Sequence, residues 1–152
     1  KMIESAIKIL KGEKIIDQAD IDIDIGIYGF IPEEIIPQAE LRLSIYKEIS
    51  SIKENKNLEQ NKKDFIDRFG DVTSEITNLY ELSKLKNIAR KLNILSIKYR
   101  DENFSLKLAD DSRLIPPSSK IREIKVNAKD IKSDRLTFIM SKLESFLEKN
   151  EI

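Results

Sequence analysis

The chain of 152 residues has the length of one ordinary domain, and folding at that size buries roughly 70% of the surface of the unfolded chain. Its 27 basic and 27 acidic residues cancel, so a general affinity for polyanions would require the charges to segregate onto one face. The absence of His and Cys excludes Ser/His and Cys/His nucleophilic catalysis, structural zinc of the usual kind and disulfide bonds. No apolar run approaches the ~20 residues of a membrane span, and no signal peptide is evident, so we expect a cytoplasmic protein.

The N-terminal residues carry a short helical pattern. Four apolar residues recur at spacings of three and four before Lys11 and Gly12, and they predict an amphipathic helix over residues 2–11. These residues are Ile3, Ala6, Ile7 and Leu10. The chain begins inside this pattern, which is typical of a piece of a longer protein.

A two-residue period follows and predicts a β-strand within residues 20–31. Isoleucines form one side of the predicted strand, and Asp22 and Asp24 form the other. Asp20, Asp22 and Asp24 also have the spacing that begins a calcium-binding loop, but Ile25 and Ile31 stand where that loop needs Gly and Glu. We therefore interpret the aspartates as the solvent-facing side of a strand at a sheet edge and predict no metal site.

Three helical patterns come next, after Pro32 and Pro37. The pattern over residues 38–52 spreads its apolar residues around much of the circumference, which predicts a central helix that is buried on more than one side. Asn57 and Gln60 have the form of a capping box and predict the start of a second helix, which Gly70 ends. The third helix is predicted to begin near Thr73 or Ser74 and to continue to Leu92, with a basic last turn.

The last third of the chain predicts a small sheet and a final helix. Strands are expected over residues 96–100 and 103–108, joined by a turn at Asp101 and Glu102, and over residues 121–126. Ser133 is expected to cap an amphipathic helix that reaches the polar end of the chain. Separate runs of helices and strands indicate an α+β fold: a compact single domain, with a helical cluster packed on a small, mostly antiparallel sheet and a C-terminal amphipathic helix.

Catalytic and cofactor motifs are missing from the sequence. None of the four glycines belongs to a Walker or dinucleotide fingerprint, so no nucleotide site is predicted. Adjacent carboxylates such as Glu33 and Glu34 are expected by chance among 27 acidic residues. We therefore predict a non-catalytic domain without a cofactor or metal.

One polar group stands out in the second predicted helix. Asp64, Asp67 and Arg68 have i, i+3 and i+4 spacing and share one helix face. An intrahelical pair between Asp64 and Arg68, worth about 0.3 kcal/mol, is one interpretation, and spacing alone favours it. A charged protein-docking patch is the other, because Arg flanked by carboxylates can make bidentate bonds across an interface.

A series of motifs runs in order from about Ile21 to Ile97. The most specific is Ile-Asp-Arg-Phe-Gly at residues 66–70, preceded by Arg-Leu-x-x-Tyr-Lys at residues 42–47 and by Phe-Ile-Pro-Glu-Glu at residues 30–34. This series resembles the C-terminal domain of the bacterial transcription-repair coupling factor family. Residues 1–12 resemble the end of the linker helix after that family's translocase motor. The resemblance implies a linker end over residues 1–14 and the C-terminal domain over residues 15–152.

The resemblance implies a regulatory role in transcription-coupled nucleotide excision repair. In that family, the C-terminal domain docks on the UvrB-like N-terminal domain of the same chain, masks the surface that binds UvrA, and restrains an ATP-dependent DNA translocase until RNA polymerase is engaged. The family's interface residues match Asp64, Asp67 and Arg68. With the resemblance, the docking patch becomes the favoured interpretation. We expect the isolated domain to be a monomer without a membrane partner.

Two other functions stay open at this level. An accessory DNA-binding domain would use the basic residues Lys84, Lys86, Arg90 and Lys91 of the third predicted helix. A domain that only stabilises its neighbours would be insensitive to charge changes at Asp67 or Arg68.

Overall fold

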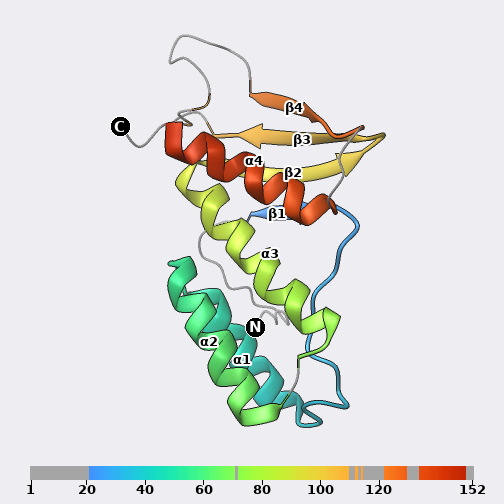
Figure 1. Ribbon diagram of the computed structural model, residues 1–152, viewed down its shortest axis with the longest axis vertical. Coiled ribbons are helices and arrows are strands. Elements are labelled where there is room, and N and C mark those ends of the chain that lie inside the picture. The colour runs from blue at the N-terminus through green and yellow to red at the C-terminus, as the bar shows by residue number, and fades with distance from the viewer. Residues whose placement is uncertain are drawn as a thin grey trace.

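A four-stranded sheet and four helices make up the computed structural model, which describes residues 21–70, 72–109, 112, 114, 122–129 and 134–149 (Figure 1). The predicted helix over residues 2–11 and the predicted cap Ser133 lie outside the described residues. In chain order, the elements are β1 (Asp22–Asp24), α1 (Ala39–Ser51), α2 (Asn55–Phe69), α3 (Ser74–Lys91), β2 (Ile94–Arg100), β3 (Asn103–Leu108), β4 (Glu123–Asn127) and α4 (Arg135–Lys149).

The sheet has the strand order β1-β2-β3-β4, and only β1 runs parallel to its neighbour. The β2–β3 turn is the predicted one, and Asp101 and Glu102 both have positive φ, 53° and 63°, as the common two-residue hairpin turn requires. Helices α3 and α4 lie together on one face of the sheet (Figure 1). The predicted α+β architecture is therefore confirmed.

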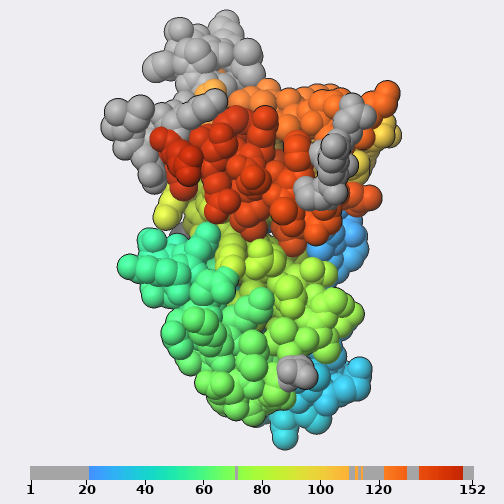
Figure 2. Space-filling model, in the orientation of Figure 1, coloured from blue at the N-terminus to red at the C-terminus, as the bar shows by residue number. Residues whose placement is uncertain are grey.

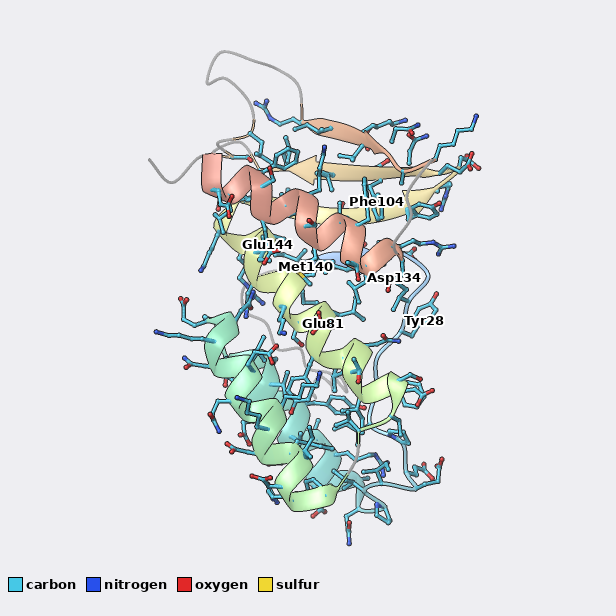
Figure 3. The ribbon with its side chains drawn as sticks, in the orientation of Figure 1. Tyr28, Glu81, Phe104, Asp134, Met140 and Glu144 are labelled. Atoms are coloured by element: carbon cyan, nitrogen blue, oxygen red, sulfur yellow. The ribbon has the colours of Figure 1, made fainter. Side chains whose placement is uncertain are left out.

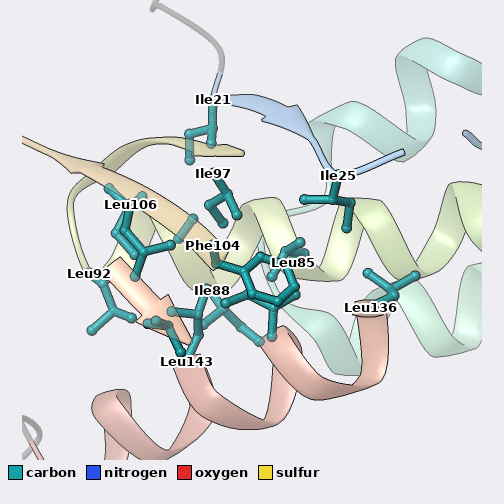
Figure 4. Close-up of a cluster of buried hydrophobic side chains, with 14 of the residues drawn as sticks. Ile21, Ile25, Leu85, Ile88, Leu92, Ile97, Phe104, Leu106, Leu136 and Leu143 are labelled. Carbon is teal, nitrogen blue, oxygen red and sulfur yellow. The ribbon is translucent and has the colours of Figure 1, made fainter. Parts of the chain in front are cut away.

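Two hydrophobic clusters share helix α3. The larger cluster joins the second half of α3 to the sheet and to α4, with Leu85, Phe104 and Leu143 at its centre (Figure 4). The smaller cluster joins the first half of α3 to α1 and α2 through Tyr80 and Phe65. The prediction that the helix over residues 38–52 is central is wrong. Only Ile45 and Ile49 of α1 are buried, whereas six residues of α3 are.

The first strand is also shorter than predicted. The alternation persists in burial, since Ile21 and Ile25 are buried while Asp22 and Asp24 are exposed, as expected for a sheet edge. Regular pairing with β2 nevertheless stops at Asp24. The backbone turns at Gly26, which has φ 76°, and Arg135 Nη1 donates a hydrogen bond to the Ile25 carbonyl at 2.9 Å. Because that carbonyl is bonded to α4, the chain leaves the sheet here.

Tertiary contacts set the start of α2. The helix begins at Asn55, two residues before the predicted capping box, and Gln60 Nε2 donates to Asp64 Oδ1 at 3.0 Å, one turn further along the helix. Asn55 Oδ1 accepts a hydrogen bond from Asn87 Nδ2 at 3.0 Å, so α3 holds the first residue of α2. The other predicted helix ends are confirmed at Gly70 and at Thr73, whose Oγ1 accepts from the Ile76 amide. Asp134 caps α4 by accepting from the Thr137 amide at 2.7 Å.

The Arg-Leu-x-x-Tyr-Lys motif of α1 holds the turn that precedes it. Arg42 Nη1 donates to the carbonyls of Ile36 and Pro37 at 2.8 and 3.0 Å, and the Tyr46 hydroxyl accepts from the Ile31 amide at 2.7 Å. Backbone groups that have no helical or strand partner are thereby satisfied by side chains. The motif thus has a structural role at these positions.

The segment between β1 and α1 descends along α3 and touches its backbone at Gly29 (Figure 1). A Cβ added at Gly29 would lie closer than 3.0 Å to the backbone nitrogen of Leu79. The Phe30 amide donates to the Glu75 carbonyl at 3.2 Å, and Asn78 Nδ2 donates to the Tyr28 carbonyl at 3.3 Å. Glycine is therefore required for this close approach.

We predict that Gly29→Ala lowers the free energy of unfolding by about 3 kcal/mol, because backbone on both sides must shift to admit the methyl group. Urea denaturation with an unchanged slope would measure the loss. Glu34→Ala, at an exposed position of the same segment, is the control and should change stability by less than about 0.5 kcal/mol. Equal stability of the two variants would contradict the close contact.

Candidate docking surface on helix α2

Helix α2 has one buried and one exposed face. Leu58 and Phe65 pack into the smaller cluster, while Asp64, Asp67 and Arg68 are all exposed near the C-terminal end. Figure 2 shows α2 on the visible surface below α4. The three residues therefore share one exposed face of the helix, as their spacing predicted. Arg68 also lies in the last turn, where a cation is favoured by the helix dipole.

The three side chains do not neutralise one another. Among the described residues, Asp64, Asp67 and Arg68 form no ion pair within 4.0 Å, so the intrahelical Asp64–Arg68 pair is not made. Asp64 Oδ1 instead accepts from Gln60, and the Arg68 guanidinium carbon lies 4.8 Å from the centre of the Phe69 ring. Stacking on this ring holds the guanidinium at the surface with its N–H groups available to a carboxylate.

The hollow beside this face is too small for a metabolite. Asp64 and Arg68 line it together with residues of α1 and α2, and its volume is about 30 Å³, whereas small-molecule sites usually enclose at least ~300 Å³. Asp67 lies outside the hollow, next to Ile66, whose side chain is 37% exposed. A charged surface with so small a hollow and the partly exposed Ile66 fits a macromolecule better than a small molecule.

A chain of hydrogen bonds supports the surface from below. The buried Tyr80 hydroxyl donates to Asn61 Oδ1 at 2.6 Å, and Asn61 Nδ2 donates to Glu48 Oε2 at 2.7 Å, so the chain joins α3, α2 and α1. Burial raises the pKa of Tyr80 to about 12, and the charges of Glu48 and Asp64 add to this effect. The network fixes the axial position of α2 relative to its neighbours.

Sequence spacing did not reveal Glu48, Asn61 and Tyr80. Each comes from a different helix, so no local pattern joins them. The only signal in the sequence is that Asn61 lies one helical turn before Asp64 and Phe65.

The DNA-binding interpretation expects the basic residues of α3 to face solvent, and Lys84 does not. Lys84 forms ion pairs with Glu59 of α2 and Glu81 of α3, and its side chain is only 17% exposed. Burial lowers the pKa of Lys84, and Glu144 of α4 opposes that shift. Figure 3 labels Glu81 and Glu144 on the two adjacent helices. Lys84 therefore joins α2, α3 and α4 rather than facing solvent.

The remaining cations of α3 are partly engaged as well. Lys91 Nζ lies 3.5 Å from Glu54 Oε1 at the start of α2, and Arg90 Nη1 donates to the buried Asn87 at 2.7 Å. Two of the four residues in the DNA-binding interpretation thus pair with carboxylates, Lys84 with Glu59 of α2 and Lys91 with Glu54 just before it. No group of three His, Cys, Asp or Glu residues suited to a metal ion occurs in the described part of the chain. No helix there is long and apolar enough to cross a membrane.

Comparisons with known proteins agree on one family. A family model described as the TRCF domain matches residues 25–119. The transcription-repair-coupling factor of Rickettsia bellii is 30% identical over 142 residues, which is 91% of this chain and 13% of that protein. The Escherichia coli transcription-repair-coupling factor is 26% identical over 121 residues, which is 76% of this chain and 10% of that protein. The chain therefore spans about an eighth of the length of the relatives that it matches.

A solved structure is similar in fold. The C-terminal domain of a transcription-repair coupling factor has a TM-score of 0.70 and 19% sequence identity, and the match covers 88% of this chain and 97% of the solved one. At this identity, the likeness concerns the fold.

We predict that Tyr80 ionises near pH 12 in a titration followed by tyrosinate absorbance. Its folded pKa lies above the unfolded value of 10.0, so the associated stability is complete below pH 10 and is lost as the pH rises through 12. A shift of this size corresponds to about 3 kcal/mol. Tyr80→Phe should flatten this loss of stability in alkaline denaturation, with Tyr28→Phe, at an exposed position, as the control. An unchanged alkaline profile in Tyr80→Phe would contradict the buried network.

Proposed function

We propose that this chain is a non-catalytic regulatory domain. The premise is that it belongs to the transcription-repair coupling factor family and corresponds to its C-terminal domain. It docks reversibly on a UvrB-like N-terminal domain of the same parent chain. The exposed end of α2 carries the contact, through Asp64, Asp67 and Arg68. The docked domain masks the surface for UvrA and restrains the motor of a DNA translocase until RNA polymerase is engaged.

The observation that carries this proposal is the state of the three charged residues. They are exposed, and none of them forms an ion pair with another described residue. Arg68 is held over Phe69 with its guanidinium at the surface. Arg flanked by carboxylates can exchange paired charge-assisted bonds with a partner of the reciprocal pattern.

A polar contact suits reversible autoinhibition. A switch needs a closed state only a few kcal/mol below the open one, since a larger gap could not be reversed by a partner of ordinary affinity. Charge-assisted bonds at a surface with a single half-exposed Ile66 supply a difference of that order without a large apolar area. A predominantly apolar interface would be harder to open.

The whole-protein role follows from the same premise. The relative from Rickettsia bellii is about seven times as long as this chain, so the ATP-dependent translocase, DNA binding and contacts with RNA polymerase belong to the remaining part of the parent protein in this proposal. An accessory DNA-binding role for α3 has less support, because Lys84 already pairs with Glu59 of α2 and Lys91 with Glu54 just before α2.

We predict that the chain binds the separately expressed UvrB-like module in calorimetry and that added salt weakens the binding. The double variant Asp67→Lys/Arg68→Glu keeps the net charge but reverses both partners, and it should weaken binding at least about tenfold. The matched control is Glu123→Lys/Lys125→Glu, which reverses two exposed charges on β4 and should leave binding unchanged.

A second format covers a weak contact. If the separate modules give no heat, a flexible Gly/Ser linker between them raises the effective concentration to the millimolar range. Small-angle scattering should then show a compact particle for wild type and an extended one for the double variant. Wild-type binding that survives the reversal would contradict the choice of residues, and an extended wild-type fusion would contradict docking itself.

A further inference from the structure

A groove runs along a different face of α3 from the one that contacts α2. Two adjoining hollows share Ser83 and Lys86 and together form this α3 groove. The larger hollow, about 240 Å³, lies between the segment after β1 and α3, and the smaller one, about 50 Å³, lies against the end of α1. The groove is therefore bounded by two segments that are distant in sequence and has α3 as its floor.

The groove walls are largely apolar. Ile27, Leu79 and Leu82 line the larger hollow and are only partly buried, and Ile49 and Ile52 line the smaller one. Tyr28 borders the larger hollow and is 71% exposed (Figure 3). An apolar strip over the junction of both clusters is the kind of surface onto which an amphipathic helix packs.

The chain itself has a segment of matching chemistry. Residues 2–11, which lie outside the described residues, carry Ile3, Ile7 and Leu10 at helical spacing. An isolated helix of ten residues is marginal in water and needs tertiary contacts for its apolar stripe. The segment and the groove each have an apolar surface that requires a partner.

The tether is long enough and enters at the right end. Asp22 of β1 pairs with Ser96, shortly after α3 ends, and Ile21 packs in the same cluster as Ile88 and Leu92 (Figure 4). Residues 12–20 can span about 30 Å when extended, whereas the part of α3 from Leu79 to Arg90 is about 17 Å long. The stripe can therefore reach every part of the groove.

Charge gives the direction of the segment. Residues 12–20, between the apolar stripe and β1, carry Glu13, Asp17 and Asp20 against the single cation Lys14, a net charge of −2. Lys86 and Arg90 line the groove toward the end of α3 at which β1 begins. A segment that runs back from Ile21 would pass these cations with its acidic part before its apolar part reaches Leu82 and Leu79.

We propose that residues 2–11 form an amphipathic helix that packs its apolar stripe into the α3 groove. The contact is intramolecular and does not depend on the docking role of α2, because it uses another face of α3. It would place the chain upstream of the domain directly against the helix that both hydrophobic clusters share. A displacement of residues 2–11 would then change the packing contacts of α3.

The absence of native Cys makes disulfide trapping a direct test. In the full chain, the pair Ile7→Cys/Ser83→Cys places one thiol on the stripe and one on the groove floor, and Ser→Cys is nearly isosteric. The pair Ile7→Cys/Ser105→Cys, with Ser105 on the outer face of the sheet, is the control of similar tether length. Under mild oxidation, the first pair should form an intramolecular disulfide at least about tenfold faster than the control, independent of protein concentration.

Each other outcome overturns the proposal. Equal rates for the two pairs would mean that the segment does not rest in the groove. Disulfides formed only between molecules would assign the groove to a second copy of the chain. A second pair of variants guards against a folding artefact: Ile7→Asp should lower the melting temperature, and Lys8→Asp, on the polar side of the predicted helix, should not. Equal melting temperatures would also contradict docking.

Discussion

Helix α3 is buried on both sides, and the positions of the other elements depend on this constraint. Ile76 and Tyr80 belong to the cluster with α1 and α2, whereas Leu85 and Ile88 belong to the cluster with the sheet and α4. One continuous helix therefore forms part of two cores, and neither core has α3 to itself. The segment from Gly26 to Phe30 adds a third contact along the same helix, which leaves the α3 groove between it and α1.

Polar groups at the crossover fix α2 on α3. The buried Asn87 donates to the Ile52 carbonyl and to Asn55, and Lys84 pairs with Glu59 and Glu81. Such directional bonds specify one register, whereas apolar packing alone would tolerate a shift of α2. The direction of the exposed α2 face, with its three charged residues, thus depends on side chains of α3. The three charged residues of the docking surface do not pair with one another, but the helix that carries them is held in place by hydrogen bonds and ion pairs with α3.

Periodicity predicted the elements whose burial is one-sided. The stripe of α4 and the β2–β3 hairpin with its Asp101-Glu102 turn follow from local spacing and turn chemistry, and so does the exposed face of α2. The predictions were wrong where an element's end or its burial depends on residues that are distant in the sequence. Asn87 sets the start of α2, Arg135 ends β1, and the choice of α3 over α1 as the central helix depends on packing around both. In the candidate site, helical spacing correctly placed Asp64, Asp67 and Arg68 on one face, but it favoured an intrahelical pair between Asp64 and Arg68 that the described residues do not form. Spacing could not predict the hydrogen-bonded network of Tyr80, Asn61 and Glu48, because its members come from three different helices.

Native-state hydrogen exchange of the α3 amides tests the shared-helix account most directly. Because both clusters hold α3, its buried amides at Tyr80 in the first half and at Ala89 in the second should exchange with one opening free energy, equal to that of global unfolding. Both should also show the same dependence on added denaturant. A lower opening free energy for the half that packs on α1 and α2 would contradict the account. It would mean that the docking surface and the sheet unfold as separate units.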